Sequence, residues 1–445
     1  MIDPSDHLFR REAGRMVATL TRIFGVHNLA LAEDVVQDAF CRALEVWKFR
    51  GVPENPSAWL MATAKNRALD VLRRERTART FAPELGQLLD SEWTVAPVVE
   101  ELFGANAIKD DQLRMMFSCC HPRLPEEAQV ALVLHILCGF SVNEIANAFV
   151  SRDAAIEKRI SRAKKVLAGS KRLFDLAGAD DFSGRLPAVH RALYLLFNEG
   201  YHGASPESAV RAELCQEAMR LTALLIEHPL AATPATHALA ALMCLHAARL
   251  PGRVDASGSL ISLFDQDRSR WDSRLVAEGQ RFLDLSATGP ELTQYHVEAA
   301  IAWVHATADR TEDTDWGKIV SLYNTLVTIR PSPVVALNRA IAIAQHEGPK
   351  RGLEEIRAIA GRDRLATYPF FHAALGEFEF HSGRYEIARE HFRAALAFAR
   401  NPMERQFLEQ RMGACEDAAP QRTAVARRQE APVRRVVRHK GRGPG

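Results

Sequence analysis

The stretch EEAQVALVLHILCGFSVNEIANAFVSRDAAIEKRISRAKKVL, residues Glu126–Leu167, decides how this chain folds. Apolar residues in its last part recur at i, i+4, i+7 and i+11, on one stripe of a helix: Ile156, Ile160, Ala163 and Leu167. Upstream, Ser141 and Glu144 have the spacing of a capping box that starts a short helix. Ser151 is predicted to begin the helix that follows. Two helices joined by a tight turn predict a helix-turn-helix.

The face opposite the apolar stripe is polar and mostly cationic, and it carries Glu157, Lys158, Ser161, Arg162 and Lys165. A cationic helix face of this kind suits the phosphates and base edges of a major groove. The alternative is a solvated face of an amphipathic helix in an ordinary bundle.

Charge is unevenly distributed over the 445 residues, whose formal net charge is +2. Ser151–Arg172 holds eight basic and two acidic residues, and Lys65–Arg79 holds six basic and two acidic. These two basic stretches predict two separate phosphate-facing surfaces. A chain of this length is expected to hold two to four domains at roughly 100–200 residues each.

Membrane and export signals are not expected. No run of about 18 uncharged apolar residues occurs, and the beginning, MIDPSDHLFRRE, is unlike a signal peptide. The seven cysteines form no CxxC pair, which fits reduced thiols and a cytoplasmic protein.

Leu8–Thr77 is predicted to be a compact helical domain. Its segment Leu31–Trp47 places Asp34, Gln37 and Asp38 together on one polar face, which we call the acidic face. After a Gly/Pro-containing loop, Ser57 is predicted to cap the next helix. The outward positions of that helix form a mixed surface able to bond phosphates and base edges: Asn66, Arg67, Asp70, Arg73 and Arg74.

Three spaced motifs resemble those of an extracytoplasmic-function (group IV) sigma factor of bacterial RNA polymerase. They are AEDVVQDAFCRALEVW, then NPSAWLMATAKNRALDVLRRER, then the helix-turn-helix, and together they cover about the first 170 residues. The resemblance implies a non-enzymatic promoter-specificity subunit that binds the polymerase core and promoter DNA and directs transcription initiation.

The resemblance also implies residue roles. The acidic face would dock on the clamp helices of the polymerase's largest subunit, and the second helical unit would meet the flap of the second-largest subunit. The −10 element would be read by Asn55, Asn66, Arg67 and Asp70, with Arg73 and Arg74 on phosphates. The −35 element would be read by Glu157, Lys158, Ser161 and Arg162, with Arg159 and Lys165 nearer the DNA backbone.

The expected fold is all-α. Residues 1–78 would bind the polymerase and the −10 element, 79–108 would be an acidic linker, and 109–172 would bind the −35 element. Residues 185–415 would form a helical domain resembling tetratricopeptide repeats, and 418–445 a basic disordered tail. The repeat signature consists of small residues around one aromatic: Gly376, Gly383, Ala388, Phe392 and Ala395. Ser332–Ala360 is predicted to be a weaker, preceding repeat.

The helical extension is expected to regulate the front domains in cis or to hold a protein partner. Sigma factors with such an extension form a subgroup that this chain resembles over nearly its full length. The alternative is a stand-alone helix-turn-helix regulator whose helical array binds a ligand or a protein. Leu8–Thr77 distinguishes the two, because a simple regulator has no need of it.

Cys119, Cys120 and His121 have a metal-ligand character, but no second Cys/His pair lies at suitable spacing. Their apolar neighbours favour buried thiols, so neither a metal nor a cofactor is expected. An enzymatic function would require a catalytic motif that the sequence does not display.

Overall fold

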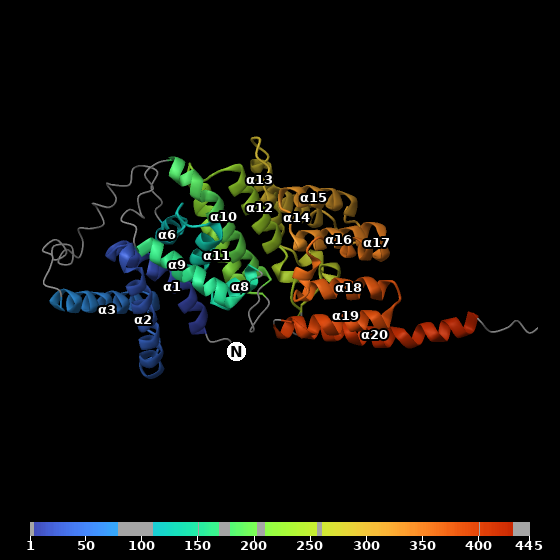
Figure 1. The fold of residues 1–445 in the computed structure, drawn as a ribbon, viewed down its shortest axis with the longest axis horizontal. Helices are drawn as coiled ribbons and strands as arrows, with labels where there is room; N and C mark the ends of the chain where they lie inside the picture. Colours follow the sequence, from blue (N-terminus) through green and yellow to red (C-terminus); the bar gives the residue numbers. More distant parts are fainter. Residues whose placement is uncertain are drawn as a thin grey trace, which may run out of the picture. The chain divides into compact units, whose positions relative to one another are not determined.

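The computed structural model describes residues 4–78, 110–149, 151–168, 179–202, 210–255, 260–399 and 401–429. The chain divides into two compact units. The first comprises Met1–Arg253 and Leu263–Asp313, and the second comprises Val254–Ser262 and Thr314–Gly445. Apart from one isolated bridge between Val254 and Leu260, the described elements are helices, as the sequence predicted (Figure 1).

The first unit begins with three long helices, of which the first two are joined by a short 3-10 turn: α1 (Pro4–Phe24), η1 (Val26–Asn28), α2 (Leu29–Arg50) and α3 (Pro56–Ala78). Leu60, Ala64 and Ala68 of α3 are fully buried. Trp47 of α2 and Trp59 of α3 lie with their ring centroids 5.5 Å apart. These contacts hold α3 against α2.

The second group of helices contains the helix-turn-helix: α6 (Asp111–Cys119), α7 (Glu126–Ile136), α8 (Val142–Ala148) and α9 (Asp153–Ala168). Gly139 adopts a left-handed φ of 66° in the turn between α7 and α8, where a side chain would be strained. The predicted capping box is present. Ser141 Oγ accepts from the Glu144 amide at 3.2 Å, and Glu144 accepts from the Ser141 amide at 2.7 Å.

Two predicted helix starts differ from the observed ones. The Asn55 side chain, and not Ser57, caps α3, because its oxygen accepts from the Ala58 amide at 3.0 Å. Ser57 already lies within the helix, one residue after Pro56. Helix α9 begins at Asp153, and its first hydrogen bonds go to the Arg152 carbonyl rather than to Ser151. Proline at the first helical position places the α3 cap two residues before the predicted one.

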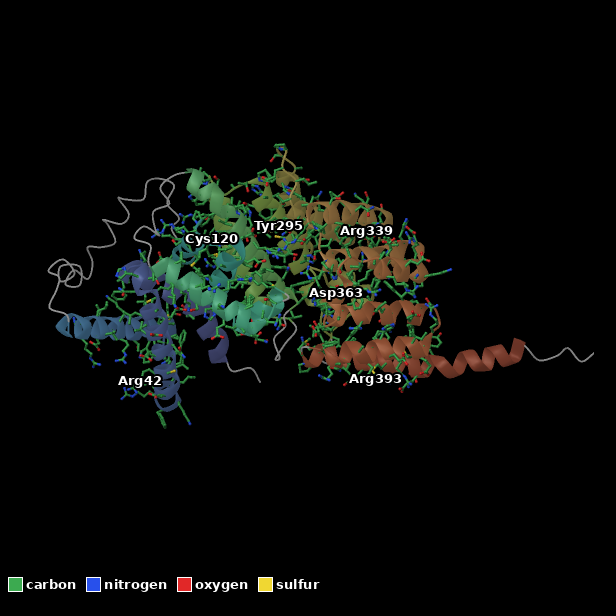
Figure 2. The ribbon with its side chains drawn as sticks, viewed as in Figure 1. Arg42, Cys120, Tyr295, Arg339, Asp363 and Arg393 are labelled. Atoms are coloured by element: carbon green, nitrogen blue, oxygen red, sulfur yellow. The ribbon has the colours of Figure 1, made fainter. Side chains whose placement is uncertain are left out.

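A third group of helices completes the first unit: α10 (Ala179–Tyr201), α11 (Ala212–Glu227), α12 (Pro234–Ala247), η2 (Leu250–Gly252), η3 (Leu263–Asp265), η4 (Arg268–Arg270), α13 (Ser273–Ser286) and α14 (Gln294–Ala306). One continuous apolar core extends from Leu20 of α1 through Phe117 of α6 to Met243 of α12. Phe117 stacks on Phe182 of α10 with centroids 4.2 Å apart. Cys120, which follows α6, is labelled in Figure 2. The third group therefore shares its core with the two groups before it.

The second unit consists of stacked antiparallel helices: α15 (Trp316–Ile329), α16 (Pro333–Glu347), α17 (Pro349–Arg357), η5 (Arg362–Leu365), α18 (Pro369–His381), α19 (Tyr385–Ala397) and α20 (Pro402–Gln429). Arg339 of α16 (labelled in Figure 2) pairs with Glu355 of α17 at 2.6 Å. A Cβ atom at Gly376 would lie 2.7 Å from the Phe392 ring, so the missing side chain lets α18 and α19 pack closely. Phe392 of α19 therefore packs directly against α18 at Gly376.

The predicted segment 185–415 is divided between the two units, because α10–α14 pack with the helix-turn-helix group while α15–α20 pack among themselves. Helix α20 extends to Gln429, so residues 418–429 of the predicted irregular tail are helical. Alanine, arginine and glutamine favour helix there despite Pro420. The predicted linker 79–108 and residues 430–445 lie outside the described residues. In the described part of the chain, no helix is long and apolar enough to cross a membrane.

Candidate polymerase and DNA interfaces

The acidic face lies on α2 with all three side chains exposed: Asp34, Gln37 and Asp38. The neighbouring positions Val35, Val36 and Ala39 are buried and hold the other side of the helix in the core. The face is therefore fixed in orientation while its polar groups remain in contact with solvent. This arrangement suits a protein partner with a basic surface.

Exposed apolar side chains continue from the acidic face towards the end of α2, a feature that the sequence analysis missed. Leu44 is 55% exposed, Phe49 is 84% exposed, and Val52 in the following loop is 65% exposed. Apolar groups of this size gathered at one end of a helix are typical of an interaction surface. Their spacing along the sequence did not distinguish them from core positions.

The −10 candidates on α3 are all exposed: Asn66, Arg67, Asp70, Arg73 and Arg74. Arg67 Nε lies 3.0 Å from Asp38 Oδ2, so this candidate pairs with a member of the acidic face. Both side chains are about half exposed, at 46% and 56%. An exposed pair of this kind contributes little to stability and is readily exchanged for a partner's groups. Asn55 is also exposed, although its amide oxygen caps α3.

Helix α9 presents the −35 candidates. Its apolar stripe is buried as predicted, with Ile156 and Leu167 fully enclosed. Five of the six candidates on the opposite face are exposed: Glu157, Lys158, Ser161, Arg162 and Lys165. An exposed helix face held by a buried stripe is the geometry with which a helix-turn-helix enters a major groove.

Arg159, the sixth candidate, has a different environment. It is half-buried, pairs with Glu127 of α7 at 2.7 Å, and its guanidinium carbon lies 5.8 Å from the centre of the Phe149 ring. These contacts tie α9 to α7 and to the turn after α8. Arg159 thus has a role inside the domain that its position on the helix did not indicate.

Helices α2 and α9, which carry two of the candidate faces, are in direct contact. Lys164 Nζ of α9 lies 2.8 Å from Glu33 Oε1 of α2, and both side chains are mostly buried. Arg22 of α1 pairs with Asp111 of α6 at 3.3 Å, and Thr19 donates to the same carboxylate at 3.2 Å. The two groups of helices that were predicted as separate DNA-binding domains therefore pack on each other.

Helix α1 also passes very close to the end of α7. A Cβ atom at Gly14 would lie 2.7 Å from the Leu137 carbonyl carbon and closer still to its oxygen. Only glycine fits at this position without a shift of the backbone. Gly14 is thus a further point, through close backbone packing, at which the two helical groups meet.

The third group of helices contacts the helix-turn-helix through buried charge. Arg211, just before α11, lies 2.8 Å from Glu144 Oε1 and 2.7 Å from Glu199 of α10. All three side chains are at most 10% exposed. We call these residues the Arg211 network. Its Glu144 is the acid of the α8 capping box.

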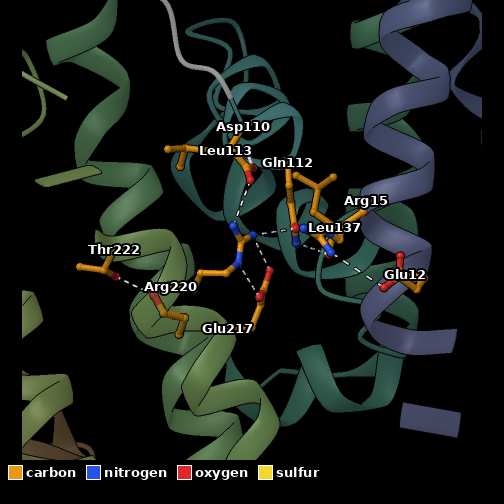
Figure 3. A network of polar contacts seen from close by, with 10 residues as sticks. Glu12, Arg15, Asp110, Gln112, Leu113, Leu137, Glu217, Arg220 and Thr222 are labelled. Atoms are coloured by element: carbon orange, nitrogen blue, oxygen red, sulfur yellow. Dashed lines mark hydrogen bonds and ion pairs between the residues drawn. The ribbon is translucent and has the colours of Figure 1, made fainter. Parts of the chain in front are cut away.

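A second contact joins α11 to α6 (Figure 3). Arg220 lies 3.0 Å from Asp110, whose side chain caps α6 by accepting from the Leu113 amide at 2.9 Å. Arg220 also pairs with Glu217 at 2.8 Å. These hydrogen bonds, chiefly the one to Glu217, raise the pKa of Arg220 above its usual value. The guanidinium therefore stays charged at this contact.

The cysteines of α6 and its surroundings are buried thiols, as predicted. Cys119 and Cys120 are at most 1% exposed. Burial raises the pKa of Cys120 to about 12, and burial likewise raises the pKa of Cys119. Neutral thiols of this kind pack as small apolar groups.

An α-helical chain with two exposed, partly basic helix faces and a helix-turn-helix belongs to the class of DNA-binding proteins. Comparison with protein families makes this specific. Residues 8–78 match sigma-70 region 2, residues 114–167 match sigma-70 region 4, and residues 185–287 match a family of unknown function, DUF6596. The sigma-70 regions are not families of enzymes.

Individual relatives agree with this assignment. The chain is 34% identical over 149 residues to the RNA polymerase sigma factor CarQ of Myxococcus xanthus, covering 32% of this chain and 75% of CarQ. It is 24% identical over 197 residues to the probable ECF RNA polymerase sigma factor SigI of Mycobacterium tuberculosis (strain ATCC 25618 / H37Rv), covering 44% of this chain and 62% of SigI. An uncharacterized protein of Rhizobium meliloti (strain 1021) is 38% identical over 398 residues, or 89% of this chain and 92% of the relative. No solved structure matches the chain.

The chain belongs to the sigma factors of RNA polymerase, of the extracytoplasmic-function type. As a sigma factor it binds the polymerase core and promoter DNA and directs transcription initiation.

Proposed function

We propose that this sigma factor is held by contacts within its own chain in a closed arrangement that cannot read a complete promoter. The observation that carries the proposal is the ion pair between Lys164 of α9 and Glu33 of α2, at 2.8 Å. It joins the helix that faces the −35 element to the helix that bears the acidic face.

The dimensions of a promoter support this proposal. The −10 and −35 elements are named for positions 25 base pairs apart. At about 3.4 Å per base pair, roughly 85 Å of DNA separates them. Helix α9 spans only about 24 Å at 1.5 Å per residue, and its Lys164 contacts α2 directly. The two helical groups must therefore separate before both elements can be read together.

The C-terminal helical region is proposed to regulate this opening in cis. The Arg211 network attaches α10 and α11 to Glu144, which is part of the helix-turn-helix itself. Arg220 attaches α11 to the cap of α6. A change in the C-terminal region can thus reach the −35 reading domain through these ion pairs, without a separate inhibitor.

Residue roles are assigned within the same proposal. The acidic face and the adjoining apolar group of Leu44, Phe49 and Val52 dock on the clamp helices of the largest polymerase subunit. The −10 element is read by Asn55, Asn66, Arg67 and Asp70, with Arg73 and Arg74 on phosphates. The −35 element is read by Glu157, Lys158, Ser161 and Arg162, with Lys165 on phosphates.

Domain roles follow from these assignments. Residues 1–78 bind the polymerase and the −10 element, and 109–172 bind the −35 element next to the flap of the second-largest subunit. Residues 185–415 regulate the separation of these two helical groups. The protein acts in the cytoplasm, where polymerase and promoters are, and itself catalyses no reaction.

Zero-length crosslinking tests the proposal. A carbodiimide condenses the Lys164 amine with the Glu33 carboxylate when the two are in contact, and mass spectrometry detects the joined peptides. We expect the 33–164 crosslink in the free protein and its loss in a complex with core polymerase and promoter DNA. Equal crosslinking yield in that initiation complex would show that no opening occurs.

Two variants control this experiment. Lys164→Arg keeps the ion pair but offers no amine, so it removes the crosslink without opening the protein. Gly14→Ala places a methyl group against the Leu137 carbonyl, where the backbone has no room. It should lower the crosslinking yield in the free protein, while helix content by circular dichroism stays unchanged because alanine favours helix over glycine.

A further inference from the structure

A cluster of arginines lies inside the first unit, where the third group of helices turns from α12 towards α13. Arg249 follows α12 and is 8% exposed, Arg253 follows η2 and is 6% exposed, and Arg268 lies in η4 and is half-buried. We call these three residues the arginine cluster. They are distinct from the polymerase and DNA faces and from the Arg211 network.

The guanidinium groups are arranged around two aromatic rings. The Arg253 guanidinium carbon lies 4.0 Å from the centre of the Tyr201 ring, and that of Arg249 lies 5.9 Å from it. Arg249 and Arg268 lie 5.3 and 5.2 Å from the centre of the Trp271 ring. Gly252 lets Trp271 approach, since a Cβ atom there would lie 3.3 Å from the indole. Three cations therefore converge on one site.

Arg249 has no acidic partner at this site. Its guanidinium forms no hydrogen bond and no ion pair within the described part of the chain, and its Nε atom is buried. Burial, together with the neighbouring charges of Arg253 and Arg268, lowers its pKa. Arg268 donates to the His305 and Ala308 carbonyl oxygens at 2.8 and 2.6 Å. Burial lowers the pKa of Arg268, while the negative charges of Glu312 and Asp313 act in the opposite direction.

Further polar atoms at the site also lack hydrogen-bond partners in the described part of the chain. Buried polar atoms without a hydrogen-bond partner in the described residues include Arg253 Nε, Tyr201 Oη, Trp271 Nε1 and His246 Nδ1. Burial, with the nearby arginines, lowers the pKa of His246 to about 3, so this imidazole is neutral. The site thus holds an excess of hydrogen-bond donors and of positive charge.

The contacts with the aromatic rings are too weak to account for this arrangement. A cation–π contact contributes about 0.5–2 kcal/mol, whereas a buried ion without a counter-charge costs several kcal/mol. Arginines with converging donors are the usual receptors for carboxylates and phosphates, which they bind with charge-assisted hydrogen bonds. An oxyanion would supply both the missing charge and the missing acceptors.

We propose that Arg249, Arg253 and Arg268, with Tyr201 and Trp271, form a binding site for a small ligand that carries an oxyanion, either a phosphate or a carboxylate group. The proposal is independent of the closed arrangement proposed above. It predicts that the full-length chain binds such anions more tightly than chloride.

Thermal unfolding of the full-length protein, combined with calorimetric titration, tests this. The probes are inorganic phosphate, sulfate and acetate, each compared with chloride at equal ionic strength. The phosphate and acetate arms distinguish the two ligand groups. We expect at least one of these oxyanions to raise the melting temperature above the chloride control, and Arg249→Met to weaken its binding by at least about tenfold, as expected for the loss of a charge-assisted contact.

The melting temperature of the ligand-free Arg249→Met variant shows whether Arg249 has a binding role or a structural one. Arg249→Met removes an uncompensated charge while keeping the side-chain bulk, so the ligand-free variant should melt no lower than the wild type. Arg274→Met, at an exposed position of α13, is the matched control and should keep the full oxyanion response. If Arg249→Met does not fold, Arg249→Lys replaces it, with weaker oxyanion binding expected.

The proposal is overturned if none of the three oxyanions stabilises the wild type more than chloride does. It is equally overturned if Arg249→Met, or Arg249→Lys in its place, keeps the wild-type response.

Discussion

Arg159 and Arg162 are three positions apart on α9, yet they have different surroundings. Arg162 is exposed on the polar face, whereas Arg159 is half-buried against Glu127 and Phe149. A side chain that extends freely from a recognition helix can form a bidentate contact with a base. A side chain that is held inside the domain mainly positions the helix. The two arginines should therefore respond differently to substitution.

Arg162→Ala and Lys158→Ala are expected to reduce promoter-specific transcription about tenfold, since a good base contact contributes about 1–3 kcal/mol. Arg159→Ala should instead lower the melting temperature and reduce transcription from different promoters to a similar extent. Run-off transcription on promoters with altered −35 elements, together with thermal unfolding, measures both effects. Interchangeable behaviour of the three variants would contradict these assignments.

The side chains of the acidic face on α2 can also be tested by substitution. Charge reversal by Asp34→Arg with Asp38→Arg should weaken binding to core polymerase by at least about tenfold, because like charges would then face a basic partner. Glu278→Arg is the control, because Glu278 is a partly exposed acid of α13, not of α2, and pairs there with Arg281. Pull-downs with core polymerase measure the difference. Unchanged affinity of the double variant, with a normal circular dichroism spectrum, would remove the acidic face from the interface.

At the scale of elements, the helix-turn-helix and the third helical group are joined by the Arg211 network. Arg211→Met would remove the guanidinium that pairs with the buried Glu144 and Glu199 carboxylates. Breaking a buried ion pair from one side costs roughly 3–5 kcal/mol. Chemical denaturation should show a loss of this size, and Arg220→Met should cost less because Arg220 is 35% exposed. A loss below about 1 kcal/mol for Arg211→Met would show that this network does not hold the elements together.

The helix pair α18–α19 tests the repeat architecture of the second unit. Phe392 is fully buried against Gly376, so Phe392→Ala should destabilise the unit by roughly 3–5 kcal/mol. Phe398→Ala is the control, because Phe398 is 38% exposed at the end of the same helix. Denaturation followed by circular dichroism compares the two. An equal loss of unfolding free energy in the two variants would contradict the packing role assigned to Phe392.

Elements with a local signal could be predicted from the sequence. The capping box of Ser141 and Glu144 and the apolar stripe of α9 depend on residues only a few positions apart, and both are present. The cap of α3 was misassigned because Asn55 and Ser57 are both good capping residues, and the proline between them decides which one is used. Exposed Phe49 could not be told from a core residue by its type alone.

At the scale of the whole molecule, the contacts that could not be predicted from the sequence join residues far apart in the chain. Glu144 and Arg211 are 67 positions apart, and Lys164 and Glu33 are 131 apart, so no spacing rule connects them. The same limit explains why segment 185–415 was predicted as one domain. Its helices have similar patterns, but α10–α12 share their core with the sigma regions. Arg249 and Arg253 likewise had no sequence signal, because arginine is expected at the surface.

Run-off transcription with core polymerase on genomic DNA of the source organism, using charge-swapped variants, tests the central claim most directly. Glu33→Lys and Lys164→Glu each break the ion pair between α2 and α9, and the double variant restores it with the charges exchanged. If the closed arrangement restrains the protein, each single variant transcribes more strongly than the wild type, and the double variant returns to the wild-type level. Single variants that transcribe no more than the wild type, together with a double variant that recovers nothing, would contradict the account.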